Sequence, residues 1–227
     1  LIVGAMGSGK TTLLRSLIGE IPNDMVIGTV ESDFELNVLR MGRHRFVVAL
    51  QERLPTSVDG HGISPAAMMR PMMRTRAHWV IVGEVRGGEG AALLRGMQTG
   101  QGSMATVHGG SAQEGLELLT DLVVDETGRN RRDVRTAVYR STDLVVHLTG
   151  DNQVGRWVSE VVAPSVEDDG DRLVLHRLFA PDDRAIDERA RPAAEPQMAM
   201  MRRLVRWAPE FSARWWLSGE DTYKPLQ

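Results

Sequence analysis

The feature that most constrains the fold of this chain is a glycine-rich segment that joins two patterns of different period. The apolar run Leu1-Ile2-Val3 ends at Gly4, and the leucines and isoleucine between Lys10 and Gly19 recur at helical spacing. Residues 4–9, which lie between them, contain three glycines. The chain therefore opens with a predicted strand, a tight loop and a helix, which is the first unit of an α/β fold.

This loop fits the pattern G-x-x-x-x-G-K-[ST], in which glycines let backbone N–H groups curl around phosphates. The N-terminus of the following helix adds a favourable partial charge. We expect Lys10 to reach the β- and γ-phosphates of ATP, and the Thr11 hydroxyl to ligate Mg²⁺. The alternative is a glycine-rich turn with no ligand. The predicted nucleotide-binding residues are Gly4, Ala5, Met6, Gly7, Ser8, Gly9, Lys10, Thr11 and Thr12.

Charge and composition exclude several other classes of protein. Only Lys10 and Lys224 among the 27 basic residues are lysine, so the position of a lysine is informative. The net charge of −3, with arginines spread along the chain, gives no reason to expect direct contact with nucleic acid. The chain has no cysteine, which excludes disulfides, and no apolar run of the ~18 residues that a transmembrane segment needs.

Further apolar runs alternate with helical patterns, which predicts an α/β fold whose mostly parallel sheet is flanked by helices. The expected strands cover residues 25–30, 46–50, 79–82 and 103–107, and the expected helices cover residues 64–76, 89–97 and 112–123.

After Asp143 the pattern changes to strands separated by turn residues, which predicts an antiparallel meander. Its strands cover residues 144–148, 154–162 and 173–179. We divide the chain into an α/β domain at 1–163, the end of the meander at 164–180, a flexible linker at 181–197 and an amphipathic helical appendage at 198–227. A basic amphipathic helix can lie on a membrane, dock on a partner, or pack against its own chain or a neighbouring subunit, and we favour the last of these.

A carboxylate follows the strand at 79–82. Ligands of doubly wound sheets lie at the carboxyl ends of the strands, so Glu84 is expected near the γ-phosphate, where it can orient a water molecule. The alternative is a solvated acid at a strand end.

Several segments, taken in order, resemble the motifs of the type II/type IV secretion-system ATPases, in particular the CpaF/TadA-like branch that drives tight-adherence pilus assembly. Gly83-Glu84-Val85-Arg86-Gly87 looks like the GEVRG signature, and residues 29–36 resemble the acidic box TIED-x-x-EL. Residues 103–108 resemble the histidine box GS-x-x-T-[IV]-H. Arg53 with Gly60-His61-Gly62, and the pair Arg74 and Arg76, resemble the arginine-bearing stretches. The resemblance covers residues 1–163.

The resemblance implies a RecA-like P-loop NTPase that works as a homohexamer, with ATP bound between neighbouring subunits. It implies that Glu84 is the catalytic carboxylate, that Glu31 and Glu35 shape the Mg²⁺ and water site, and that His108 senses the γ-phosphate. Glu31 and Glu84 would reach the metal through water. The arginines that complete the site would come from Arg53, Arg74, Arg76 and Arg86.

Each of these residues also has a structural alternative. The two acids in the acidic box are also compatible with a solvated helix start, the histidine with a core or capping residue, and any single arginine with a surface ion pair.

Some residues depart from the family pattern. Thr99-Gly100-Gln101-Gly102-Ser103 is one residue shorter than usual, which we expect to alter how this loop meets the nucleotide or a neighbouring subunit. Gly109 and Gly110 are expected to loosen the turn after His108. Pro71 should kink or shorten its helix.

At the level of the whole protein, we expect a piece of a longer chain whose N-terminal domain, which covers the nucleotide in the family, is missing here. The resemblance implies a cytoplasmic motor, peripheral at the inner face of the cell membrane, that works with integral secretion or pilus platform proteins. Two alternatives are a non-catalytic ring subunit that uses ATP as an assembly switch, and a conjugation-associated ATPase.

Overall fold

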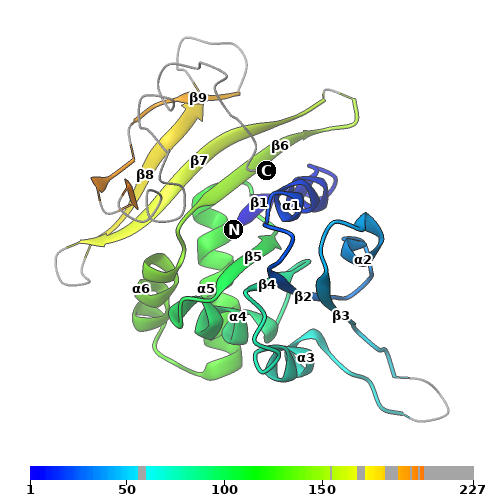
Figure 1. Ribbon diagram of the computed structural model, residues 1–227. Coiled ribbons are helices and arrows are strands. Elements are labelled where there is room, and N and C mark those ends of the chain that lie inside the picture. The colour runs from blue at the N-terminus through cyan, green and yellow to red at the C-terminus, as the bar shows by residue number, and fades with distance from the viewer. Residues whose placement is uncertain are drawn as a thin grey trace.

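The computed structural model describes residues 1–55, 60–153, 155–167, 172–181, 189–194, 196–198 and 200–201. In this part of the chain a mixed sheet runs in the order β3-β2-β4-β5-β1-β6-β7-β8-β9, with helices on both faces (Figure 1). The strands are β1 (Ile2–Gly4), β2 (Val26–Glu31), β3 (Phe46–Gln51), β4 (Trp79–Val82), β5 (Gly102–Val107), β6 (Val145–Asp151), β7 (Gly155–Glu167), β8 (Arg172–Pro181) and β9 (Ala190–Pro192). The helices are α1 (Lys10–Gly19), α2 (Val38–Met41), α3 (Pro65–Met72), α4 (Glu89–Gln98), α5 (Ala112–Thr127) and α6 (Arg131–Ser141).

Strands β1 to β6 form the parallel part of the sheet, as the alternation of strands and helices predicted. β1 lies between β5 and β6, and Ile2 pairs with Thr106 on one side and with Val146 on the other. Parallel strands place their carboxyl ends on one edge. The loops that follow β1, β2, β4 and β5 therefore meet at a single edge of the molecule.

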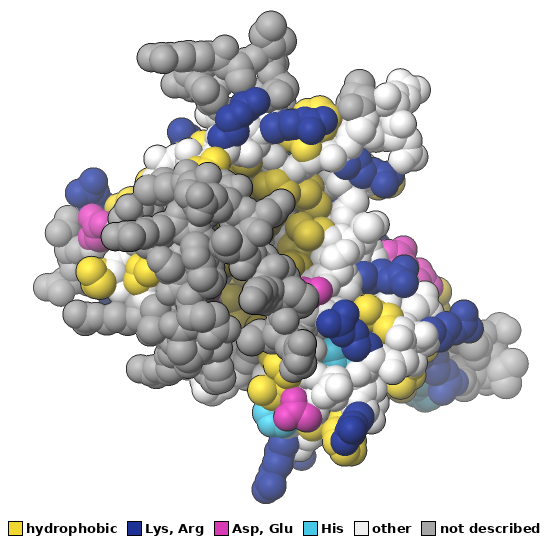
Figure 2. Space-filling view, turned by 45° about the horizontal axis from the view of Figure 1, so that its top comes forward, with side chains coloured by type: hydrophobic (Ala, Val, Ile, Leu, Met, Phe, Trp, Pro, Cys, Tyr) yellow, Lys and Arg dark blue, Asp and Glu magenta, His cyan; other side chains and the backbone are white. Residues whose placement is uncertain are grey.

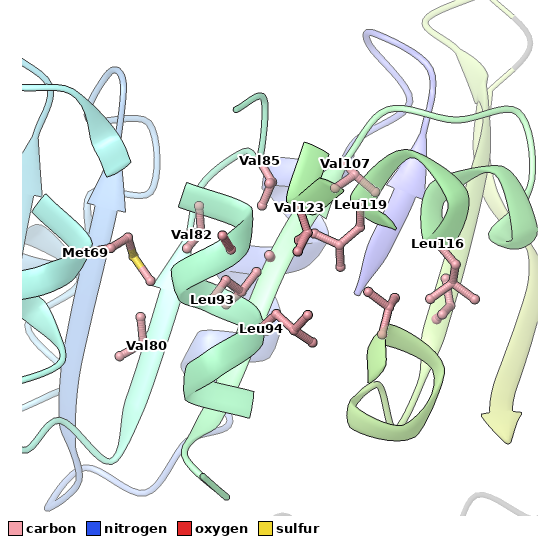
Figure 3. Packing of buried hydrophobic residues seen from close by; sticks show 14 of the residues in the cluster. Met69, Val80, Val82, Val85, Leu93, Leu94, Val107, Leu116, Leu119 and Val123 are labelled. Carbon is pink, nitrogen blue, oxygen red and sulfur yellow. The ribbon is translucent and has the colours of Figure 1, made fainter. Parts of the chain in front are cut away.

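Two hydrophobic clusters hold the helices on this sheet, because alternate side chains of a strand point to opposite faces. On one face, helices α3 to α6 cover a cluster that includes Val80, Leu94 and Leu119 (Figure 3). On the other face, Leu14 and Ile18 of α1 pack with residues of β1, β2 and β4. The central strands β1, β2, β4 and β5 thus have buried residues on both faces of the sheet.

The predicted meander is confirmed, since β6, β7 and β8 pair antiparallel. β7 is continuous across residues 163 and 164, where we had placed a boundary. The expectation of a flexible linker at 181–197 is wrong for Ala190–Pro192, because these residues pair with β8 as strand β9. Residues 182–188 and 195 lie outside the described part.

Only the start of the predicted C-terminal appendage is described. Met200 is 5% exposed and packs with Ala163 of β7 and Leu178 of β8, so this methionine contacts its own chain. Residues 202–227, which hold most of the predicted amphipathic helix, lie outside the described residues.

The helix expected at 64–76 is shorter than its pattern. Ser64 caps it, with its Oγ accepting from the N–H of Ala67, and it ends at Met72, one residue after Pro71. Proline has no N–H to continue the ladder, and the chain then turns through Arg76, whose φ is 56°. The shortening that Pro71 predicted is therefore present.

Basic side chains are spread over the visible face of the molecule and do not gather in a single patch (Figure 2). This distribution agrees with the scattered arginines of the sequence. Among the described residues, no helix is both long and apolar enough to cross a bilayer.

Candidate functional site

A cleft of about 430 Å³ opens at the edge where the parallel strands end. The loop between β1 and α1 forms one side, and residues that follow β2, β4 and β5 form the other. The start of β7 adds one further wall. The lining residues are Met6, Gly7, Gly9, Lys10, Thr11, Thr12, Glu31, Ser32, Asp33, Glu35, Leu36, Gly83, Glu84, Arg86, Thr106, His108 and Arg156.

The glycine-rich loop owes its shape to two residues with positive φ. Gly7 has φ 78° and Gly9 has φ 95°, values that an L side chain rarely adopts. Gly9 is also the N-cap of α1, and no side chain caps this helix. The first N–H groups of α1 therefore remain available at the cleft.

Lys10 lies inside this loop. Its side chain is 8% exposed, and Nζ donates to the carbonyl oxygens of Gly4 and Ala5, each at 2.9 Å. Burial lowers the pKa of Lys10, while the negative charge of Glu84 opposes this shift. A buried ammonium beside free N–H groups creates a strongly electropositive site.

The nine residues of the predicted phosphate loop divide into two sets. Six of them line the cleft, whereas Gly4, Ala5 and Ser8 do not. Ser8 is buried, and its N–H donates to Ala5 O at 3.3 Å, which tightens the turn.

Two acids at the end of β2 lie on the opposite side of the cleft: Glu31 is the last residue of the strand, and Glu35 lies in the loop that follows it. Glu31 is 3% exposed, and its Oε2 accepts from the N–H of Leu36 at 2.8 Å. Burial raises the pKa of Glu31, and this hydrogen bond opposes the rise. Glu35 Oε2 accepts from Thr11 Oγ1 at 3.2 Å. Since α2 begins only at Val38, neither acid belongs to a helix start.

Glu84 follows β4, and the structure engages both oxygens of its carboxylate. Oε1 lies 2.6 Å from Nε2 of His108, and Oε2 forms an ion pair with Arg86. The Glu84 side chain is 22% exposed, so it stands at the mouth of the cleft and not beneath it. Glu84 therefore contacts Arg86 of its own motif and His108 of the histidine box.

The turn after His108 is firmer than its two glycines predicted. A Cβ on Gly109 would lie 2.8 Å from Val3 Cγ1, so glycine is required for the close approach of β1. The N–H of Gly110 donates to Glu114 Oε2 at 2.7 Å. We therefore correct the expectation that this turn is loose, because packing and a hydrogen bond hold it in place.

The shortened loop at residues 99–103 does not meet the cleft. It leads into the amino end of β5, on the opposite edge of the sheet, and Gln101 Nε2 donates to Ala77 O at 2.8 Å. The expectation that this loop alters contact with the nucleotide is wrong for this cleft. The loop lies at the amino end of β5, whereas the cleft lies at the carboxyl end of the same strand. Contact with a neighbouring subunit stays a prediction.

Of the four arginine candidates, only Arg86 lines the cleft. Arg53 forms a β-bridge with Ile63 beyond the edge strand β3. Arg74 and Arg76 precede β4 and lie toward its amino end. A role for these three at the boundary of a neighbouring subunit stays a prediction.

Sequence reasoning missed one basic residue of the cleft. Arg156 is the second residue of β7, in the antiparallel part of the sheet, and yet it lines the cleft beside Gly9. None of the sequence motifs contains it. The available signal was its place just after a predicted turn between two strands, which does not by itself indicate a ligand.

Comparison with known proteins places the chain in a family. The profile described as Type II/IV secretion system protein matches residues 1–164. VirB11 of Bartonella henselae, a type IV secretion system protein, is 31% identical over 153 residues, which cover 64% of this chain and 41% of that protein. A putative conjugal transfer protein of Mycobacterium tuberculosis is 31% identical over 166 residues, which cover 71% of this chain and 45% of that protein.

Solved structures agree with this result. The VirB11 ATPase of Brucella suis, in complex with sulphate, has a TM-score of 0.62 at 29% identity, covering 71% of this chain and 47% of that one. The pilus retraction motor PilT with bound ADP has a TM-score of 0.50 at 19% identity, covering 92% of this chain and 50% of that one, and shows similarity of fold alone. The chain spans less than half the length of the curated relatives that it matches here. With its match over residues 1–164, the chain belongs to the type II/IV secretion system protein family.

Proposed function

We propose that this chain is the ATP-hydrolysing motor domain of a secretion or pilus-assembly ATPase, with a RecA-like P-loop fold. The observation that carries the proposal is the arrangement across one cleft. Lys10 and the N-terminus of α1 lie on one side, and Glu84, held between His108 and Arg86, stands at the mouth. Phosphoryl transfer requires positioning and charge stabilisation, and both kinds of group are present.

The phosphate loop would bind the nucleotide through its backbone. The first N–H groups of α1 have no capping side chain, so they can donate to phosphate oxygens. Lys10 would exchange its two carbonyl acceptors for the β- and γ-phosphates. A phosphate would also favour the charged form of this ammonium, whose pKa burial lowers.

The residues around Thr11 fit Mg²⁺. A magnesium ion in such sites takes hard oxygen ligands, one or two from the protein and the rest from water and phosphate. Thr11 Oγ1 would supply one ligand, since it faces the carboxylate of Glu35 at 3.2 Å. Glu31 and Glu84 would hold metal-bound water. When bound, the ion would neutralise charge that develops on the phosphates.

Glu84 would orient the attacking water and accept its proton. His108 fixes one carboxylate oxygen at 2.6 Å, and Arg86 holds the other. A water molecule needs one of these oxygens, so Arg86, which is 67% exposed, would leave Glu84 as the site fills. Through its contact with Glu84, His108 would report whether the γ-phosphate is present.

The test replaces Glu84 in the full-length protein. Glu84→Gln keeps the shape and removes the base, so phosphate release should fall by about 100-fold or more while ATP binding stays close to wild type. Asp125→Asn, at an exposed position on α5, is the matched control and should change neither quantity. Unchanged turnover in Glu84→Gln would remove Glu84 from the mechanism.

At the level of the assembly, we propose a homohexameric ring that converts ATP hydrolysis into fibre assembly or protein export. The tight-adherence branch, with CpaF and TadA, remains our preferred assignment on the motifs in the sequence. The ring would work in the cytoplasm against integral membrane platform proteins. The similarity to the VirB11 ATPase of a type IV secretion system supports a secretion motor in general.

A conjugation-associated role is a second candidate, because one relative is described as a putative conjugal transfer protein. ATP hydrolysis that DNA stimulates, with a steep dependence on salt, would favour this role over protein export.

A nucleotide-dependent assembly switch without turnover is a third candidate. It is favoured by the engagement of both oxygens of Glu84, which leaves neither free for water. Oligomerisation that depends on ATP, with no phosphate release above background, would support it.

A further inference from the structure

Arg156 reaches the cleft from a part of the fold that contains no recognised motif. It lies at the start of β7, and its side chain is exposed. A Cβ built on Gly9 would lie 3.2 Å from Cδ of Arg156, so the aliphatic stem of the arginine covers the last glycine of the phosphate loop. The guanidinium is thus carried over the N-terminus of α1.

The surroundings of this guanidinium are electropositive. The N-terminus of a helix disfavours a cation, and Lys10 of the same loop adds a full positive charge. In the described part of the chain, no carboxylate pairs with Arg156. Its Nη2 donates a hydrogen bond to the amide oxygen Oδ1 of Asn152. Two basic groups and a helix N-terminus that face one cleft are complementary to a multiply charged anion.

The backbone holds Arg156 in place relative to the loop. Arg156 pairs with Gly150 across the β6–β7 ladder, and β6 pairs in turn with β1, where Gly4 lies opposite Leu148. Gly4 begins the phosphate loop. Only β6 therefore separates the strand that carries Arg156 from the strand that feeds the loop, so the two move as one sheet. Asn152, in the turn between β6 and β7, then orients the side chain.

We propose that Arg156 is a second basic contact for the phosphate chain of the bound nucleotide, made from the antiparallel part of the sheet. This inference rests on the proposed nucleotide binding. Arg156 lies over Gly9, whereas Glu84 is engaged by His108 and Arg86, so Arg156 acts on binding and not on the attack of water. It positions ATP and ADP alike and does not distinguish the transition state.

The test measures the affinity of the chain for ATP and ADP by calorimetry, with Arg156→Gln, Arg156→Lys and Lys10→Ala compared. Arg156→Gln should lower the affinity for both nucleotides by about tenfold, because a charge-assisted contact is lost at an exposed position. Arg156→Lys should restore part of the affinity, since lysine keeps the charge without the planar fork. The difference between wild type and Arg156→Gln should shrink as salt rises.

The matched control is Arg172→Gln. Arg172 also begins a strand of the antiparallel part, and it pairs with Glu167 at 3.5 Å, away from the cleft. This variant should bind both nucleotides as the wild type does. In the catalytically competent protein, Arg156→Gln should raise KM for ATP and leave kcat within about twofold, the opposite of the result for Glu84→Gln.

The outcomes separate this inference from the proposed function. If Lys10→Ala weakens binding strongly while Arg156→Gln binds like the wild type, the role of Arg156 is overturned and the nucleotide site stands. If kcat falls and KM does not change, Arg156 acts in the chemical step and the inference is wrong. A wild-type chain that binds neither nucleotide overturns the proposed function, and this inference with it.

Discussion

The parallel part of the sheet, from β3 to β6, and the antiparallel part, from β6 to β9, contribute to the cleft in different ways. The parallel strands deliver Lys10, Glu31, Glu84 and His108 from four successive strand ends. Among the described residues of the antiparallel strands, Arg156 alone lines the cleft. A parallel sheet brings the carboxyl ends of strands that are far apart in sequence to one edge. In a meander, the carboxyl ends of consecutive strands lie at opposite edges. The chemistry therefore concentrates where the strands are parallel.

The two parts also differ in their packing. Two clusters of buried residues cover both faces of the parallel strands. The outer antiparallel strands contribute to a smaller cluster, in which Ala163, Leu178 and Met200 are buried. We therefore expect the parallel part to carry most of the free energy of unfolding.

The largest expected effect tests this difference in stability. Leu119→Ala removes a side chain that is fully buried between α5 and the sheet, and should lower the free energy of unfolding by about 4 kcal/mol. Leu178→Ala, in the smaller cluster, should cost about 2 kcal/mol, because fewer buried neighbours lose contact. Denaturant unfolding followed by circular dichroism measures both. Equal costs would contradict the comparison.

The next prediction concerns binding in the parallel part. Lys10→Ala should lower the affinity for ATP by about a hundredfold, because the ammonium is the one full positive charge within the glycine-rich loop. Lys10→Arg should also bind poorly, since the site is only 8% exposed and the guanidinium is larger and planar. Leu178→Ala should keep wild-type affinity in the same titration. A loss in Leu178→Ala comparable to that in Lys10→Ala would show that the two parts are not separable.

The smallest effect concerns the buried acid of the parallel part. Burial raises the pKa of Glu31 above its ordinary value of 4.5, so the native state binds this proton more tightly than the unfolded chain does. The charged form therefore costs stability at neutral pH. Glu31→Gln should raise the free energy of unfolding at neutral pH by less than either leucine substitution lowers it, and should reduce turnover.

The dependence on pH gives this prediction its control. As pH falls through the folded-state pKa of Glu31 toward 4.5, the wild type gains the proton and its penalty disappears. The advantage of Glu31→Gln should therefore vanish over this interval. An advantage that is constant from about pH 8 to about pH 4.5 would exclude burial of the charge as its cause.

Much of the parallel part could be predicted from local pattern. The helix expected from Lys10 to Gly19 has those bounds in the structure, because its apolar spacing and the glycine before it both specify it. Helix α3 ends earlier than its pattern, as Pro71 indicated. Strand β9 was missed, because Ala190–Pro192 has no strand period and is ordered by its pairing with β8.

The site was predictable in its residue types and not in its contacts. The motifs identified Glu84 and His108 separately, but their contact at 2.6 Å depends on the order of β4, β5 and β1 in the sheet. Arg74 and Arg76 were grouped with the site by resemblance, and the fold places them toward the amino end of β4. For a residue in a loop, its position in the sequence does not indicate at which edge or on which face of the sheet it lies.

By itself, the sequence determined the glycine-rich loop, the acidic strand ends and the lysine at the helix start, because each depends on short-range geometry that a few residues specify. Only the tertiary structure decided that Glu84 is held by two partners, that the shortened loop lies away from the cleft, and that Arg156 lies over Gly9. Apart from the ion pair between Glu84 and Arg86, these contacts join residues far apart in the chain. They exist because buried parallel strands bring their ends to one edge, and because the adjoining meander returns one strand beside it.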